Sequence, residues 1–395
     1  MQGISRTSGI DSTATSTFTA KKTTLDQVDL LFDARHIRQT GIGSYISAQL
    51  PYLEEALFQR QKSLAVLADE DAVPPVRRST KVISSPQSAA PMYSIREQKA
   101  WSDALDSVRP RAVWLPHYPC PLALFRPRNS EIKLFVTVLD TIHLLERNIS
   151  GLGFGRRMYA RTMLSLDVRR CRQIITPSYA TARNLLRLAP TAPVTMAPIP
   201  IDSSWFEPVD TTLSPIQGKY ILYVGLPKRH KNLPLLINAH AAIASEVPHK
   251  LVIAGGGNVA SRVDERVELL VGNNAHNIEL VGRLDFDALR SLVAGADLLV
   301  LPSLHEGAGL PPLEAMACRT AVLASDIPAL RETCGDGADY FDPHDPEELA
   351  YLMRRYCSDQ EARAQLTERG WSHVTRRQST ISFSAAAEAI CSGLE

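Results

Sequence analysis

Residues 296–318 read ADLLVLPSLHEGAGLPPLEAMAC. The opening apolar run is typical of a buried strand. Pro311 and Pro312 suit the first turn of a helix, where a missing N–H costs little. Between the strand and the helix, Gly307 and Gly309 leave backbone amides uncovered by side chains. A strand, a glycine turn and a helix in this order predict one unit of an open parallel sheet, which binds ligands beyond the carboxyl ends of its strands.

The same rhythm runs through both halves of the sequence. Apolar runs lie at 27–32, 64–68, 112–115, 133–139 and 173–177, and further runs begin at 219, 250, 277, 296 and 320. Longer polar or amphipathic stretches separate them, and this alternation predicts parallel sheets covered by helices. We therefore expect an α/β fold of two Rossmann-like domains whose parallel sheets face a central cleft.

A proline-rich stretch, APTAPVTMAPIPIDSSWFEP at 189–208, divides the two halves. It cannot continue a helix and suits a domain connection, with a hinge expected near 198–215. Pro51 is expected to interrupt the helix after the first strand. The expected divisions are a disordered tail at 1–24, an N-terminal domain at 25–200, a C-terminal domain at 201–375, and a terminal helix at 376–395 that packs back toward the N-terminal domain.

Charge and cysteine content exclude several classes of protein. The 43 basic and 42 acidic residues leave a net charge of +1, so no overall field draws the chain to nucleic acid. The sequence contains no run of about 18 apolar residues, so we expect no membrane-spanning helix. The six scattered cysteines lack zinc-ligand spacing and are typical of reduced thiols in a cytoplasmic protein. Asp285 and Asp287 precede a helix as capping acids would, so we assign no metal.

Two acids frame the helix that begins near Pro311. Glu306 follows the strand and can accept hydrogen bonds from sugar hydroxyls, while the helix amino terminus is a favourable place for a diphosphate. Glu314, on the first turns of the helix, can reach ribose hydroxyls. Taken singly, either acid could also be an ordinary residue that stabilises the helix dipole.

Two further loops are expected to face the same cleft. In YVGLPKRHKNLPLLINAH, from Tyr223, Gly225 ends a strand and the cations Lys228, Arg229 and Lys231 precede a helix. Such cations can offset the charge that develops on a departing phosphate, although a solvated basic loop is the alternative. In the first half, Gly41 and Gly43 stand between a strand and a helix and offer amides from the opposite side, or form only a tight turn.

The strings EGAGLPPLEAMAC, VGLPKRHKNLPLLI and TGIGSY together resemble glycosyltransferase family 4, the retaining group 1 enzymes of GT-B fold. The resemblance implies transfer of a hexose from a nucleotide sugar, with mannose from GDP-mannose the first expectation. The acceptor would be a glycan or a lipid-linked oligosaccharide in lipopolysaccharide or exopolysaccharide synthesis. The C-terminal domain would bind the donor and the N-terminal domain the acceptor, with no cofactor and no metal.

The resemblance also implies roles for single residues. The first glutamate of the family's E(x7)E motif, Glu306 here, contacts the sugar, and the second, Glu314, contacts the ribose. Lys231 and Arg229 correspond to the basic residues on the diphosphate. The donor-binding set that we expect is Gly225, Lys231, Glu306, Gly307, Gly309, Leu310 and Glu314.

Two positions depart from the family pattern. Ala308 replaces a phenylalanine, and Leu139 in VTVLDTIHLL replaces a histidine that lies near the sugar and phosphate. Asp140 keeps its place and is a candidate catalytic residue. The loss of this histidine either shifts its work to a neighbour such as His117 or His143, or lowers activity. His117, in a PHY segment similar to that of polymer-building transferases, could equally be structural.

The loss of this histidine keeps a non-catalytic sugar-nucleotide-binding or scaffold subunit open as an alternative, and a nucleotide-sugar epimerase is a second. A dehydrogenase is disfavoured because Ala260 replaces the third glycine of a dinucleotide fingerprint in AGGGNVA. The arginines between Arg156 and Arg172 lie among apolar residues on a predicted helix. They suggest contact with anionic lipid on the inner face of the cytoplasmic membrane, with a solvated helix face as the alternative.

Overall fold

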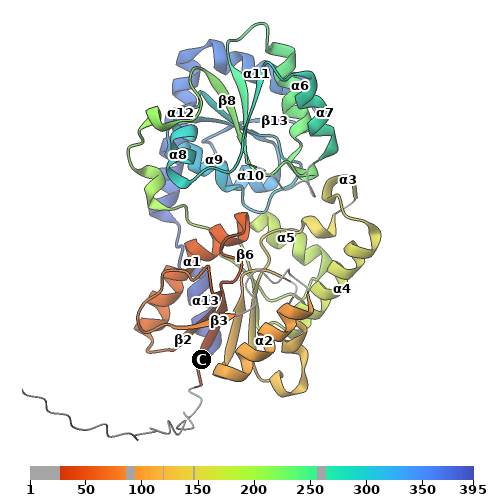
Figure 1. The fold of residues 1–395 in the computed structure, drawn as a ribbon, viewed down its shortest axis with the longest axis vertical. Helices are drawn as coiled ribbons and strands as arrows, with labels where there is room; N and C mark the ends of the chain where they lie inside the picture. The colour runs from red at the N-terminus through yellow and green to blue at the C-terminus, as the bar shows by residue number, and fades with distance from the viewer. Residues whose placement is uncertain (1–26, 86–93, 119, 146, 256–263) are drawn as a thin grey trace, which may run out of the picture.

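The computed structural model describes residues 27–85, 94–118, 120–145, 147–255 and 264–395. The predicted tail at 1–24 and most of the AGGGNVA segment lie outside the described residues. The chain forms two α/β lobes, drawn red to yellow and green to blue in Figure 1, and the final helix returns to the first lobe.

The N-terminal lobe is built on one parallel sheet. Its strand order is β3-β2-β1-β4-β5-β6-β7, and every pairing is parallel. The strands are β1 (Leu30–Asp33), β2 (Leu64–Asp69), β3 (Lys81–Ser85), β4 (Ala112–Leu115), β5 (Lys133–Thr137), β6 (Gln173–Thr176) and β7 (Val194–Met196).

Helices cover both faces of this sheet, because its strands carry apolar side chains on both sides. One core includes Trp101 of a covering helix. The other includes Tyr45 of the first helix and Ile390 of the last helix of the chain. The α-helices of this lobe are α1 (Thr40–Gln59), α2 (Ile95–Val108), α3 (Arg147–Ser150), α4 (Phe154–Arg170), α5 (Tyr179–Leu188) and α13 (Ala385–Leu394).

The C-terminal lobe repeats this plan with one large core. Its parallel sheet has the order β10-β9-β8-β11-β12-β13. The strands are β8 (Tyr220–Val224), β9 (Lys250–Ala254), β10 (Ile278–Val281), β11 (Leu298–Leu301), β12 (Ala321–Ser325) and β13 (Asp339–Phe341). The α-helices are α6 (Leu233–Ile243), α7 (Glu265–Asn273), α8 (Phe286–Ala294), α9 (Leu310–Ala317), α10 (Pro328–Cys334), α11 (Pro346–Ser358) and α12 (Gln360–Thr380).

Short 3₁₀ turns complete the connections. They are η1 (Leu122–Phe125), η2 (Pro127–Asn129), η3 (Ile142–Leu144), η4 (Ser203–Phe206), η5 (Thr211–Leu213) and η6 (Arg229–Lys231).

The predicted α/β fold of two parallel sheets is confirmed, and one local expectation is wrong. Helix α1 runs from Thr40 to Gln59 without a break, with Pro51 inside it. The proline-rich stretch is not only a connection, because β7 (Val194–Met196) lies within it and pairs with β6. As predicted, Asp285 caps α8, and its Oδ1 accepts a 2.9 Å bond from the amide of Ala288.

Candidate active site

Strand order reverses direction once in each sheet, between β1 and β4 and between β8 and β11. Loops on either side of such a reversal diverge to opposite faces and leave a crevice at the carboxyl edge, where ligands of open α/β sheets bind. Lys231 follows β8 and Glu306 follows β11. The topology therefore brings the two sequence-predicted donor loops to one crevice.

Lys231 and Glu306 are in direct contact. The Nζ atom of Lys231 lies 2.6 Å from Oε1 of Glu306, and the hydroxyl of Ser303 donates to the same oxygen at 2.6 Å. The Glu306 side chain is 8% exposed and that of Lys231 is 18% exposed. A charge-assisted contact with so little water holds both side chains in one orientation.

The loop geometry depends on glycine at two places. Gly309 has φ +70 and caps α9, whose first turn contains Pro311 and Pro312. Gly225 ends β8 with φ +150, and its amide donates to the carbonyl of Ala254 at 2.9 Å. These positive φ angles favour glycine. They let the two backbones turn at the carboxyl ends of β8 and β11.

Glu314 projects from α9 and is partly buried. Desolvation raises the pKa of its carboxyl to about 7. Leu310, the first residue of the same helix, packs against the cores of both lobes. Helix α9 thus carries both Glu314, the predicted ribose contact, and Leu310, which lies at the junction between the lobes.

The loop that carries Glu306 is clamped by the N-terminal lobe. A Cβ at Gly307 would overlap the carbonyl oxygen of Leu139. Ser178 and Thr181, at the start of α5, donate to the carbonyl of Gly307 at 2.6 and 3.2 Å. Glu332 of α10 accepts from the first amides of α5, at 2.7 and 2.9 Å. These contacts fix the cleft wall from both sides.

Leu139, at the position where the resemblance implies a histidine, forms part of this wall, because its carbonyl oxygen lies against Gly307. Neither His117 nor His143, the two candidates to replace that histidine, makes a described contact there. His143 is exposed, and His117 belongs to a different cluster. His305, which precedes Glu306, lies at the wall instead, with Nε2 3.5 Å from the hydroxyl of Thr141. Desolvation lowers the pKa of His305, although Asp140 opposes this effect. Sequence reasoning passed over His305, and its only signal was its place next to Glu306.

The other predicted residues near the cleft differ in burial. Arg229 is exposed, and its side chain runs beside Gly151 of the N-terminal lobe. His230 lies buried beside it, and desolvation, with the charge of Lys231, lowers its pKa to about 3. The carboxylate of Asp140 accepts from the amide of Ile142 at 2.9 Å, which shapes its own loop.

In the N-terminal lobe, Gly41 and Gly43 lie in the first turn of α1. A Cβ at Gly43 would overlap the carbonyl oxygen of Ile37, whereas a Cβ at Gly41 would meet no atom within 4 Å. Only Gly43 is required by packing.

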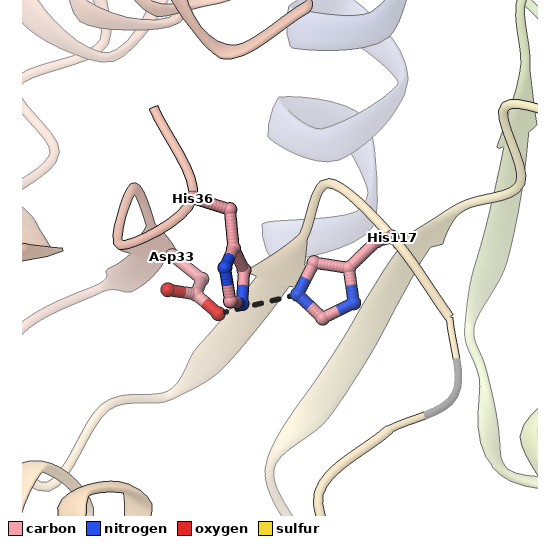
Figure 2. Close-up of side chains that lie close together, drawn as sticks. All are labelled: Asp33, His36 and His117. Carbon is pink, nitrogen blue, oxygen red and sulfur yellow. Dashed lines mark ion pairs between the residues drawn. The ribbon is translucent and has the colours of Figure 1, made fainter. Parts of the chain in front are cut away.

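His117 lies beyond β4, next to Asp33 at the end of β1 and His36 in the following turn (Figure 2). Burial tends to raise the pKa of Asp33, but the guanidinium of Arg35 holds it well below its usual range. Desolvation lowers the pKa of His36 to about 4, so its imidazole is neutral at pH 7. Of these three residues, the sequence predicts only His117 as a candidate site residue.

The family model for glycosyl transferases group 1 matches residues 210–373. The O-antigen chain mannosyltransferase RfbU of Salmonella typhimurium is 30% identical over 235 residues, which are 60% of this chain and 62% of that protein. The O-antigen chain mannosyltransferase B of Escherichia coli is 31% identical over 157 residues, 38% of this chain and 40% of that protein. The chain thus spans less than two thirds of the length of these relatives.

Solved structures match over nearly the whole chain. Sucrose-phosphate synthase from Thermosynechococcus elongatus superposes with a TM-score of 0.72 at 21% identity, and covers 93% of this chain and 98% of its own. HepE from Anabaena, solved in complex with UDP-glucose, gives a TM-score of 0.69 at 14% identity, and covers 93% of this chain and 100% of its own. At identities this low, the matches establish only the fold, which is GT-B. Residues 210–373 therefore match the group 1 glycosyl transferase model, within a chain of GT-B fold.

Proposed function

We propose that this protein is a retaining glycosyltransferase that moves a hexose from a nucleotide sugar to a glycan or lipid-linked acceptor in polysaccharide synthesis. The observation that carries the proposal is the 2.6 Å contact between Lys231 and Glu306 in the crevice between β8 and β11. It joins a cation suited to diphosphate with a carboxylate suited to sugar hydroxyls in a nearly dry site.

The surroundings of each side chain support the roles that we propose. Lys231 would exchange its contact with Glu306 for the diphosphate, with Arg229 adding charge from the exposed side. Glu306 would orient the sugar, and Glu314 would accept from the ribose. Gly225, Gly307, Gly309 and Leu310 would line the donor site. Asp140, in the N-terminal lobe, and His305, next to Glu306, would both face the sugar.

Mannose from GDP-mannose is the donor that we propose first, because O-antigen mannosyltransferases are among the relatives. An α-maltose-1-phosphate synthase from Mycobacterium tuberculosis is also 34% identical over 120 residues. The donor therefore needs a direct assay. No cofactor and no metal are expected in the transfer step.

The assay should offer GDP-mannose, UDP-glucose and other nucleotide sugars to the full chain, with a lipid-linked glycan as the acceptor. We expect turnover with GDP-mannose above the others, and an α-linked product by NMR, as retention of the donor's α configuration requires. Turnover with a β-linked product would exclude a retaining mechanism. Transfer from a different sugar alone would overturn the proposed donor.

A non-catalytic sugar-nucleotide-binding or scaffold subunit is the alternative, and Leu139 in place of the family histidine favours it. The two functions differ in turnover. Tight binding of a nucleotide sugar, with neither transfer nor slow hydrolysis of any donor, would support the scaffold.

We also propose that the protein works in the cytoplasm, against the inner face of the cytoplasmic membrane. Helix α4 exposes Phe154, Met158 and Tyr159 beside Arg156 and Arg161. Apolar rings among cations are typical of helices that lie on anionic lipid. Among the described residues, no helix is both long and apolar enough to span a bilayer.

A further inference from the structure

The N-terminal sheet has its own reversal of strand order, between β1 and β4. Strands β1 and β4 are neighbours there, in the register Leu30↔Ala112 and Phe32↔Trp114. Asp33, His36 and His117 meet at the carboxyl edge of these two strands. Each offers one potential ligand atom, and these three atoms lie within 4.8 Å of one another (Figure 2).

The two imidazoles are buried without hydrogen-bond partners for most of their nitrogen atoms. His36 is 6% exposed and His117 is 5% exposed. Within the described part of the chain, Nε2 of His36 and both ring nitrogens of His117 have no hydrogen-bond partner. The distance from Nε2 of His117 to Oδ2 of Asp33 is 3.6 Å, too long for a hydrogen bond. Buried polar atoms are nearly always paired, so two histidines with unpaired ring nitrogens beside one carboxylate point to a ligand that binds between them.

The carboxylate of Asp33 is held in place by Arg35 and can still accept one more hydrogen bond or bind a metal ion. Arg35 donates to Oδ1 of Asp33 from its backbone amide and Nε, and to Oδ2 from Nη2 at 2.8 Å. A carboxylate has about four lone-pair sites. Arg35 therefore leaves one site on Oδ2, the oxygen nearest His117.

His36 is also held by a neighbour. The side-chain amide of Gln39 lies 3.0 Å from its Nδ1, and this contact leaves Nε2 as the atom directed at the cluster. An outer partner on the other ring nitrogen is characteristic of histidines that ligate metals, where it fixes the tautomer and the ring orientation. The amide oxygen of Gln39 would face Nδ1–H in that case.

We propose that Asp33, His36 and His117 bind one divalent transition-metal ion of the zinc class. Two imidazoles and one carboxylate form a donor set that Zn²⁺ accepts, with a fourth position open to water or a hydroxyl. The site lies on the N-terminal lobe, apart from Lys231 and Glu306. It does not depend on the proposed transfer activity, because it is tested by metal binding alone.

The test uses the full chain, stripped of metal by a chelator and then titrated with Zn²⁺ by calorimetry. We expect one equivalent to bind, and we expect His36→Gln and His117→Gln each to lower the affinity at least about tenfold. His143→Gln, at an exposed histidine, is the matched control and should bind as the unmodified chain does. Zn²⁺ should raise the melting temperature of the unmodified chain and the control more than that of the two variants.

X-ray absorption of the zinc-loaded unmodified chain decides the ligand type even if a variant fails to fold. Two imidazoles with oxygen ligands are expected. A sulfur shell would place the ion on cysteines and overturn the proposal. It would also be overturned if the unmodified chain bound no Zn²⁺ at micromolar concentrations, or if folded glutamine variants bound it unchanged.

Discussion

Glu314 should make donor binding depend on pH. Desolvation raises the pKa of its carboxyl to about 7 in the free protein, and ribose hydroxyls would donate to its ionised form. Donor binding should therefore lower this pKa and release a proton. GDP-mannose affinity should fall as the pH drops from 8 to 6, by up to about tenfold for each pH unit below 7.

Calorimetry at several pH values checks this, with GDP-mannose chosen because its diphosphate has no ionisation near neutrality. Glu314→Gln should bind more weakly at pH 8 and lose the dependence. An affinity of the unmodified chain that stays flat from pH 6 to 8 would argue against the ribose contact.

Single site residues could be predicted from the sequence where they stand in a recognisable local motif. Glu306 and Lys231 each follow a recognisable strand, so the sequence placed both at the cleft. Their contact spans 75 positions and depends on β8 and β11 being neighbours, which no local pattern records. Asp33 and His36 carry no motif, and only the pairing of β1 with β4 brings them to His117.

At the scale of elements, α4 should hold the protein on anionic vesicles. Each cation near such a surface contributes roughly 1 kcal/mol, so exchanging Arg156, Arg157 and Arg161 for glutamate should abolish co-sedimentation at low salt. Binding by the unmodified chain should fade as salt rises.

The matched control makes the same charge change at Arg319, Arg369 and Arg376, which are exposed in the C-terminal lobe. It should leave co-sedimentation intact. If the unmodified chain ignores vesicles even at low salt, α4 is only a solvated face.

Elements were predictable where their apolar runs are long, and β4 was expected at its observed bounds, 112–115. Strands β3, β7 and β13 were missed because they are short or mixed with polar residues. Pro51 removes one helical hydrogen bond at a cost of about 3 kcal/mol. The residue is exposed, while Leu50 and Leu53 beside it are buried, and burial of such side chains offsets this cost.

At the scale of the whole molecule, the contact between Gly307 and Leu139 should set the distance between the lobes. Gly307→Ala places a methyl group on the Leu139 carbonyl, so the lobes should separate. Transfer should fall about 100-fold, as expected for reacting groups displaced by about 1 Å. Circular dichroism should stay unchanged, while small-angle scattering should report a larger radius of gyration.

Gly272→Ala, in α7, is the control, since a Cβ there meets no atom within 4 Å. It should retain both transfer and shape. If Gly307→Ala transfers as fast as the unmodified chain, the close approach of the lobes does not govern catalysis.

The central claim is that Lys231 and Glu306 bind different parts of the donor: Lys231 binds the diphosphate and Glu306 binds the sugar. GDP affinity, measured by calorimetry in the two alanine variants, tests this most directly. Lys231→Ala should weaken GDP binding about 10- to 100-fold, because a charged hydrogen bond is lost. Glu306→Ala should bind GDP at least as tightly as the unmodified chain, because it frees Lys231, and should nevertheless fail to transfer sugar. Unchanged GDP affinity in Lys231→Ala, or near-normal transfer by Glu306→Ala, would contradict the account.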